Sequence, residues 1–168
     1  MLQYTICFIK KGQDMLLLNR RKAPTMGLWN GVGGKLEKNE TPYECVIRET
    51  FEETGIVLDH VTYAGNALFH SEHGNSGMYI FIVEFPPDSE LFTPLDTVEG
   101  ILDWKPIEWI LDEDNLGVVG NLKKFLPEVL RGNYFQEHKF IYNNHNMQSY
   151  KTSPLVEDEV HSMSVTIK

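Results

Sequence analysis

Cysteine is scarce in this 168-residue chain, which contains only Cys7 and Cys45. Their spacing forms no metal-binding or redox motif and gives no disulfide framework, so a reducing, cytoplasmic setting is the simplest expectation. Long apolar runs are also absent, because no stretch approaches the ~18 consecutive apolar residues of a membrane-spanning helix. The apolar run at 4–9 precedes Lys10 and Lys11, an order that does not fit a signal peptide. We therefore expect no membrane association.

Basic residues are in the minority. Lysine and arginine total 15 against 24 aspartates and glutamates, which gives a formal net charge of -9. This balance disfavours bulk nucleic-acid binding, because phosphate-dominated binding needs a basic face. An anionic substrate would need something other than net charge to hold it, and a divalent cation is the obvious candidate. The one basic cluster in the first half of the chain is Arg20, Arg21 and Lys22.

The pattern of apolar and turn residues predicts several strands and few helices. The expected strands are 4–9, 15–19, 61–69, 78–85 and 101–105. A helix is expected near 120–130, although Pro127 disfavours it. Strands and helices in this order predict an α+β fold in which a mixed β-sheet is sandwiched between α-helices.

The length suits one domain with an extension, and a hydrophobic fraction of 42% is ordinary for a globular chain. We place the domain at 1–131 and the extension at 132–168, where the composition changes. Polar and aromatic residues from 134 to 150 predict a hairpin that turns at 143–146, and these residues are available for a homodimer interface. A mobile or partner-dependent tail is expected after the hairpin.

The segment GGKLEKNETPYECVIRETFEETGI, residues 33–56, carries the signals of a helix. Thr41 can cap its start, Pro42 suits the first helical position, and Glu44 completes a capping box. Gly55 suits the C-terminal cap, so the helix is expected at 42–54. The residues expected on its core-facing side are Tyr43, Val46, Ile47, Thr50, Phe51 and Thr54.

Glu49, Glu52 and Glu53 fall together on another side of this helix, at positions i, i+3 and i+4. No lysine four residues later relieves their mutual repulsion, whereas a hard cation held by oxygen ligands would. Gly33 and Gly34 stand directly before the helix and let backbone approach a ligand closely. Together these features indicate a site for Mg²⁺ and a pyrophosphate.

The same segment resembles the Nudix box, which is a glycine, five residues, a glutamate, seven residues, and then Arg-Glu-x-x-Glu-Glu-x-Gly with an aliphatic residue. The matching residues are Gly34, Glu40, Arg48, Glu49, Glu52, Glu53, Gly55 and Ile56. The one departure is Thr50, where the family prefers an aliphatic residue, and it bears on packing more than on chemistry. The order of strands and loops resembles the family over roughly 2–131.

The resemblance implies an enzyme that hydrolyses a nucleoside diphosphate linked to another moiety, with Mg²⁺ or Mn²⁺ as cofactor. Carried onto this chain, Glu49, Glu52 and Glu53 become metal ligands, and the Gly34 carbonyl can be a further one. Arg48 is expected to pair with a box glutamate and orient it. Glu52 or Glu49 is our first choice for the general base, and Glu99, from a later loop, is the alternative.

The loop GLWNGVGGKLEKNET resembles the loop that lies beside the base pocket in MutT-like oxidised-nucleotide diphosphatases. The residues assigned to substrate binding on this basis are Asn30, Gly33, Gly34 and Lys35. An asparagine amide can donate and accept together, as reading a purine edge requires, but Asn30 before Gly31 is also typical of a turn. Arg20 and Arg21 can contact terminal phosphates, or they form a solvated strand end.

The leading hypothesis is a Mg²⁺-dependent pyrophosphohydrolase of a guanine nucleoside polyphosphate. Two substrate classes compete: oxidised purine triphosphates such as 8-oxo-dGTP, and the alarmones pppGpp and ppGpp, which would be converted to pGpp. One alternative is a Nudix-fold nucleotide sensor without catalysis, which the three box glutamates disfavour. Another is a 5′-RNA pyrophosphohydrolase, which the acidic composition disfavours.

Overall fold

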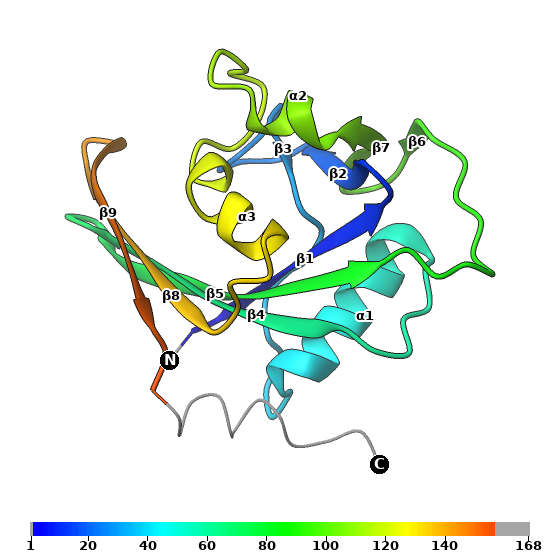
Figure 1. Cartoon of the computed structure of the whole chain (residues 1–168), viewed down its shortest axis with the longest axis horizontal. Helices are drawn as coiled ribbons and strands as arrows, with labels where there is room; N and C mark the ends of the chain where they lie inside the picture. Colours follow the sequence, from blue (N-terminus) through cyan, green and yellow to red (C-terminus); the bar gives the residue numbers. More distant parts are fainter. Residues whose placement is uncertain (1, 157–168) are drawn as a thin grey trace.

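The computed structural model describes residues 2–156 and folds them into one mixed β-sheet with helices on both faces (Figure 1). Within this range the strands are β1 Tyr4–Lys11, β2 Asp14–Arg20, β3 Trp29–Asn30, β4 Thr62–Ser71, β5 Gly74–Glu84, β6 Leu95–Asp96, β7 Gly100–Pro106, β8 Gln136–Asn143 and β9 Asn146–Pro154. Their order is β6-β7-β2-β1-β5-β4-β8-β9, and β3 pairs with β2. The pairs β1–β5 and β4–β8 are parallel and the others antiparallel. The predicted α+β fold is confirmed.

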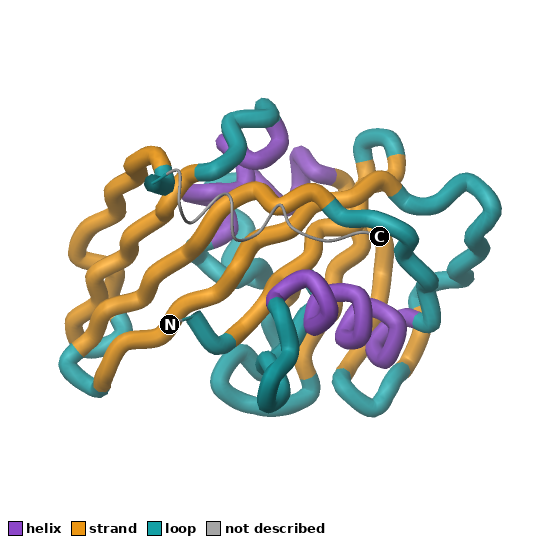
Figure 2. Tube along the Cα trace, turned by 90° about the horizontal axis from the view of Figure 1, so that it is seen from below, coloured by secondary structure: helices purple, strands orange, loops and turns teal. Residues whose placement is uncertain are grey.

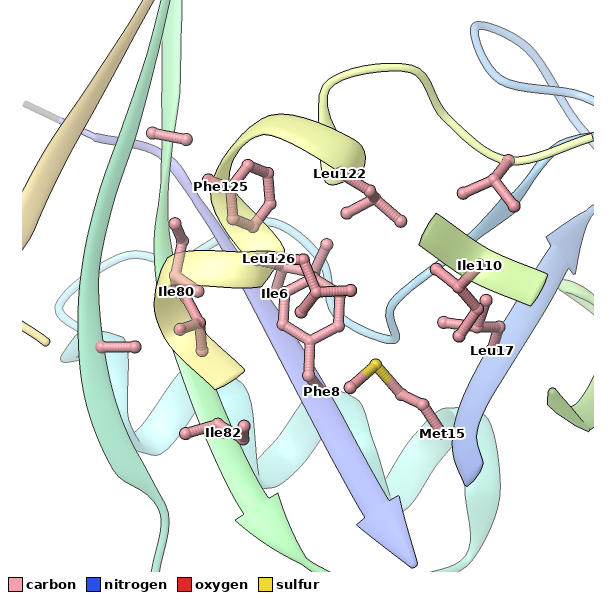
Figure 3. Packing of buried hydrophobic residues seen from close by; sticks show 14 of the residues in the cluster. Ile6, Phe8, Met15, Leu17, Ile80, Ile82, Ile110, Leu122, Phe125 and Leu126 are labelled. Carbon is pink, nitrogen blue, oxygen red and sulfur yellow. The ribbon is translucent and has the colours of Figure 1, made fainter. Parts of the chain in front are cut away.

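Side chains of β1 alternate between two apolar layers, as the two-residue period of a strand dictates. Ile6 and Phe8 join the layer under α2 (Ile107–Leu111) and α3 (Leu122–Leu130), whereas Cys7 and Ile9 join the layer under α1 (Pro42–Thr54). Figure 3 shows the first layer, in which Phe125 of α3 lies close to the side chains of β1. Figure 2 shows α1 crossing the opposite face of the sheet.

Helix α1 has the predicted bounds, Pro42–Thr54, because its caps are encoded locally. The Glu44 N–H donates to Thr41 Oγ1 at 3.2 Å, and the Thr41 N–H donates to Glu44 Oε2 at 2.9 Å, which forms the capping box. Gly55 follows in the left-handed conformation, with φ 74°, and its N–H caps the last turn.

The buried stripe of α1 differs from the predicted one. Val46, Thr50 and Thr54 are buried as predicted, and Tyr43 and Ile47 are partly buried against the apolar layer under α1, also as predicted. The prediction for Phe51 is wrong, since its side chain is 54% exposed, whereas Cys45 and Glu53 are buried. The loop 31–36 packs on the side of α1 that carries Glu49 and Glu53, so the buried stripe is rotated toward that side.

Three short elements, β3, β6 and α2, have no clear signal in the sequence. β3 and β6 are two residues long, which is too short for an alternating pattern. β5 begins at Gly74, four residues before the expected start at 78. The sequence does not predict this earlier start, because residues 74–77 include no large apolar residue. The helix expected near 120–130 is confirmed as Leu122–Leu130, with Pro127 inside it. In the described part of the chain, no helix is long and apolar enough to cross a membrane.

The predicted hairpin is confirmed as β8 and β9. Its turn residues, Asn144 and His145, have φ values of 46° and 65°, as a two-residue type I′ turn requires. β8 pairs with β4 from Gly65–Gln136 to His70–Ile141, so the hairpin extends the sheet. Its use in a homodimer stays a prediction, and the predicted tail falls mainly on 157–168, outside the described residues.

His138, in β8, makes the stability of the fold depend on pH. It lies buried under α3, and its Nδ1 is 2.9 Å from the Tyr150 hydroxyl. Burial lowers the pKa of His138 to about 4, against roughly 6.5 in an unfolded chain. The unfolded state therefore takes up a proton first, so the stability that neutral His138 contributes is complete above pH ~6.5 and is lost as the pH falls toward 4.

We expect His138→Gln to reduce the pH dependence of stability. Between pH 7.5 and 5.5, the wild type should lose about 1 kcal/mol more of its free energy of unfolding than the variant, because only the wild type carries the depressed histidine. Urea titrations at the two pH values measure this difference. Equal losses in both proteins would contradict the prediction.

Candidate active site

The loop 31–36 runs beside the first half of β1 as an irregular extra strand. It can do so because β2 pairs with β1 only from Ile9 onward, which leaves earlier backbone groups of β1 available. The hydrogen bonds are Cys7 N–H to the Val32 carbonyl at 2.7 Å, Thr5 N–H to the Gly34 carbonyl at 2.8 Å, and Leu36 N–H to the Gln3 carbonyl at 2.9 Å. The loop is thereby fixed between β1 and α1.

Gly33 and Gly34 are required by this close packing. Gly33 has φ 148°, and a Cβ there would lie 2.2 Å from the Thr5 carbonyl oxygen. A Cβ on Gly34 would lie 2.3 Å from the carboxyl carbon of Glu49. The two glycines therefore pack closely against β1 and α1, and their close approach to a ligand stays a prediction. Because the Gly34 carbonyl already accepts from Thr5 N–H, it retains one lone pair for a ligand.

Arg48 joins the loop to the glutamates of α1. Its Nε and Nη2 donate to the two carboxylate oxygens of Glu40 at 2.7 and 2.9 Å, and Nη2 also donates to the Lys35 carbonyl at 3.2 Å. Its Nη1 donates to Glu49 at 2.9 Å and to Glu52 at 3.1 Å. The Arg48 guanidinium lowers the pKa of Glu40 to about 2. The predicted pairing of Arg48 with box glutamates is confirmed.

Glu53 lies on the inner side of α1 and is only 8% exposed. Its Oε2 accepts the Gly33 N–H at 2.8 Å. Burial raises the pKa of Glu53 to about 7; the Gly33 N–H opposes the rise and the nearby Glu49 adds to it. The Glu53 carboxylate therefore gains more from a neighbouring cation than an exposed glutamate would.

A pocket of about 310 Å³, here called the acidic pocket, lies between α1 and the turn that precedes β7. Its lining residues are Arg20, Gly33, Gly34, Glu49, Glu52, Glu53, Val98 and Glu99. The pocket therefore collects all three clustered glutamates of α1 together with Glu99, the predicted contribution of a later loop. Val98 is a lining residue that sequence reasoning missed, since a valine carries no signal for a polar site.

The donors of the acidic pocket suit a hard divalent cation such as Mg²⁺ or Mn²⁺, which prefers carboxylate oxygens. Within residues 2–156, no group of three His, Cys, Asp or Glu side chains is already arranged to hold a metal ion. Arg48 Nη1 lies between Glu49 and Glu52, and Glu53 is bonded to Gly33. The glutamates would therefore reorient when a cation binds, and their chemistry fits one.

A second pocket, of about 410 Å³, adjoins the acidic pocket and shares Arg20, Gly33 and Gly34 with it. Its other lining residues are Tyr4, Thr5, Ile6, Pro24, Thr25, Asn30, Gly31, Lys35 and Met78. Asn30, the last residue of β3, is half-buried there, and its Oδ1 accepts the N–H of the next residue, Gly31, at 2.9 Å. Sequence reasoning missed Tyr4 and Met78, which meet only through the parallel pairing of β1 with β5.

The two arginines at the end of β2 take different positions. Arg20 lines both pockets. Arg21 lines neither of them, because its guanidinium forms an ion pair with Asp96 and donates to the Thr97 carbonyl at 3.2 Å. Of the residues predicted to bind substrate, Arg21 is thus the one placed away from these pockets.

The family model described as NUDIX domain matches residues 3–129. The chain belongs to the Nudix family. Like the other enzymes of this family, it is a hydrolase that acts on pyrophosphate bonds. The residues described above as the acidic pocket include the Nudix-box residues Gly34, Glu49, Glu52 and Glu53.

Two curated Nudix relatives and one solved structure show how far the similarity extends. Oxidized purine nucleoside triphosphate hydrolase from Mus musculus is 29% identical over 107 residues, covering 64% of this chain and 67% of that protein. The uncharacterized Nudix hydrolase YvcI from Bacillus subtilis (strain 168) is 26% identical over 156 residues, covering 89% of this chain and 93% of that protein. The MutT protein from Bacillus halodurans has a TM-score of 0.75 at 25% identity and covers 93% of this chain and 100% of that chain. The similarities to the Bacillus subtilis and Bacillus halodurans proteins cover so much of this chain that they must include part of the β8–β9 hairpin.

Alanine substitutions at Gly33 and Gly34 should have different effects: the first should mainly reduce stability, and the second should mainly disturb the Glu49 carboxylate. Gly33→Ala should lower the free energy of unfolding by about 3 kcal/mol, because it meets rigid backbone at a positive φ. Gly34→Ala meets only the movable end of Glu49, so it should cost less stability and instead displace that carboxylate. Thermal unfolding of both variants, with Mg²⁺-dependent turnover of Gly34→Ala, measures this. Equal destabilisation by the two substitutions would contradict it.

Proposed function

We propose that this Nudix hydrolase cleaves a pyrophosphate bond of a guanine nucleoside polyphosphate and requires Mg²⁺ or Mn²⁺. The observation that carries the proposal is that the acidic pocket and the second pocket share Arg20, Gly33 and Gly34. A phosphate chain in the acidic pocket would therefore lead directly to a cavity of about 410 Å³ for the nucleoside. The purine substrate named for the mouse relative supports this choice.

In this proposal Glu49, Glu52 and Glu53 hold the cation, with the Gly34 carbonyl as a further ligand. A bound Mg²⁺ supplies charge neutralisation at the phosphate oxygens and lowers the pKa of the attacking water. Arg48 orients Glu49 and Glu52 through Nη1, while Glu40 fixes the other edge of its guanidinium. Arg48 thus links Glu40 to Glu49 and Glu52 before substrate arrives, and the cluster glutamates would reorient onto the cation when it binds.

Two walls of the acidic pocket offer a general base. Glu52 is our first choice, with Glu49 beside it, because its side chain is 56% exposed and open to a water molecule. Glu99 approaches from the other wall and is the alternative. Arg20, which lines both pockets, is placed to contact the phosphates between them.

Two classes of guanine substrate are candidates for the second pocket. An oxidised triphosphate such as 8-oxo-dGTP is supported by the similarity to the mouse enzyme. The alarmones pppGpp and ppGpp carry phosphates on both sides of the ribose, and Lys35 with Arg20 offers cations to such a substrate within the second pocket. In either case the amide nitrogen of Asn30 would donate to the purine edge, and its Oδ1 retains one lone pair after accepting the Gly31 N–H.

The two other functions are less well supported. A sensor without catalysis has no need of Glu49, Glu52 and Glu53 around one pocket with Arg48 bonded to two of them. A 5′-RNA pyrophosphohydrolase needs a basic path for the RNA chain, and the protein has a formal net charge of -9.

The direct test is turnover of a substrate panel with Mg²⁺. It includes 8-oxo-dGTP, GTP, pppGpp, ppGpp, ADP-ribose, diadenosine polyphosphates and triphosphorylated RNA, with products identified. We expect the highest kcat/KM on a guanine polyphosphate. Tight binding without turnover of any member would favour the sensor, and preferred turnover of RNA or of ADP-ribose would overturn the guanine assignment.

Amide substitutions on α1 test the metal site. Glu52→Gln and Glu53→Gln should each lower kcat by at least ~100-fold, because each removes a carboxylate that holds the cation or accepts a proton. The matched control is Glu37→Gln, which alters an exposed glutamate of the same segment outside the acidic pocket. Rates near wild type in both α1 variants would refute the assignment of this helix face.

A further inference from the structure

Arg21 holds the segment that carries Glu99 by contacts from both its side chain and its backbone. Its guanidinium pairs with Asp96 and donates to the Thr97 carbonyl at 3.2 Å. Its backbone N–H donates to the carbonyl of Glu99 itself at 2.9 Å. Arg21, directly after β2, therefore contacts the turn both at Asp96 and Thr97 and at Glu99.

The turn from Thr97 to Gly100 is tight and closes on itself. The Thr97 N–H donates to the Gly100 carbonyl at 2.8 Å, and the Gly100 N–H donates to Thr97 Oγ1 at 3.2 Å. Gly100 has φ 151°, and a Cβ there would lie 1.9 Å from the Asn19 carbonyl oxygen. The turn is thus internally defined, and the pairing of Gly100 with Arg20 fixes its C-terminal end against β2.

The N-terminal end of the turn has fewer anchors, since β6 pairs only with β7 and does not reach β2. β6 is only two residues long and both are exposed, and Phe92, in the loop before it, is 82% exposed. Glu99 also faces the carboxylates of α1 across the acidic pocket, and like charges in one site repel each other. Without a tether, repulsion would favour movement of Glu99 out of the pocket.

We propose that Arg21 is a positioning residue that acts through Glu99. The Arg21–Asp96 ion pair holds the turn from Thr97 to Gly100 against the end of β2. The Glu99 carboxylate therefore stays in the acidic pocket, opposite the glutamates of α1. Arg20 and Arg21 then have different roles: Arg20 contacts the substrate, and Arg21 contacts the turn. This inference rests on the proposed function.

The test combines single variants, a charge reversal and a Glu99→Gln background. Both partners of the pair are largely solvent-exposed, and exposed pairs contribute modestly. We therefore expect Arg21→Ala and Asp96→Ala to lower kcat about three- to tenfold with little change in KM. The double variant Arg21→Asp/Asp96→Arg should recover most of the lost rate. In the Glu99→Gln background, Arg21→Ala should change kcat less than twofold.

A matched control is Arg131→Ala, because Arg131 forms a similar exposed ion pair with Glu128 on α3. This variant should keep the wild-type kcat. If Arg21→Ala raises KM at constant kcat, or lowers the rate equally in the Glu99→Gln background, Arg21 contacts the substrate and the positioning role is overturned. A wild-type rate for Glu99→Gln alone would overturn it too.

A readout without catalysis separates this inference from the proposed function. If the wild type turns over no member of the panel, the proposed function fails, but amide hydrogen exchange still reports on the turn. The backbone N–H at position 21 joins β2 to the turn by donating to the Glu99 carbonyl. Relative to its intrinsic rate, its exchange should be at least fivefold faster in Arg21→Ala and unchanged in Arg131→Ala. Unchanged exchange in Arg21→Ala would overturn the hold of Arg21 on the turn.

Discussion

The hydrogen bonds between β1 and the loop 31–36 are the constraint on which the rest of the site depends. They place Gly33 and Gly34 where no side chain fits, directly against α1. From there the Gly33 N–H reaches Glu53, and the backbone of Gly34 touches the carboxylate of Glu49. The same two glycines form the wall common to both pockets. A single irregular strand therefore sets the position of the helix, the carboxylates and the cavities.

Electrostatics explains why an acidic chain suits an anionic substrate. Arg48 neutralises Glu49 and Glu52 in part, while Glu40 keeps the guanidinium in place. Glu53 is buried, and its pKa of about 7 means that both its protonated and its ionised forms are populated near neutral pH. In the proposed function a cation replaces that proton, so part of the cost of burying the carboxylate is offset only when the metal is present.

The sequence predicts what is encoded locally and misses what depends on distant pairing. Both ends of α1 follow from Thr41, Glu44 and Gly55. Which face of α1 is buried does not, because the loop 31–36 covers the side that carries Glu53, while Phe51 stays exposed. The acidic pocket is anticipated through the box glutamates, whereas the wall made by Tyr4 and Met78 exists only through the β1–β5 pairing.

The shared wall between the two pockets has a consequence for how such an enzyme can change. The carboxylates lie on α1 and on the turn before β7, whereas most of the second pocket lies on β1, β3, β5 and the loop around Pro24. Under the proposed function, substitutions at Tyr4, Thr25 or Met78 would alter which base is accepted without moving a metal ligand. Substrate preference and bond cleavage are thus evolutionarily separable, and only Arg20, Gly33 and Gly34 are bound to serve both.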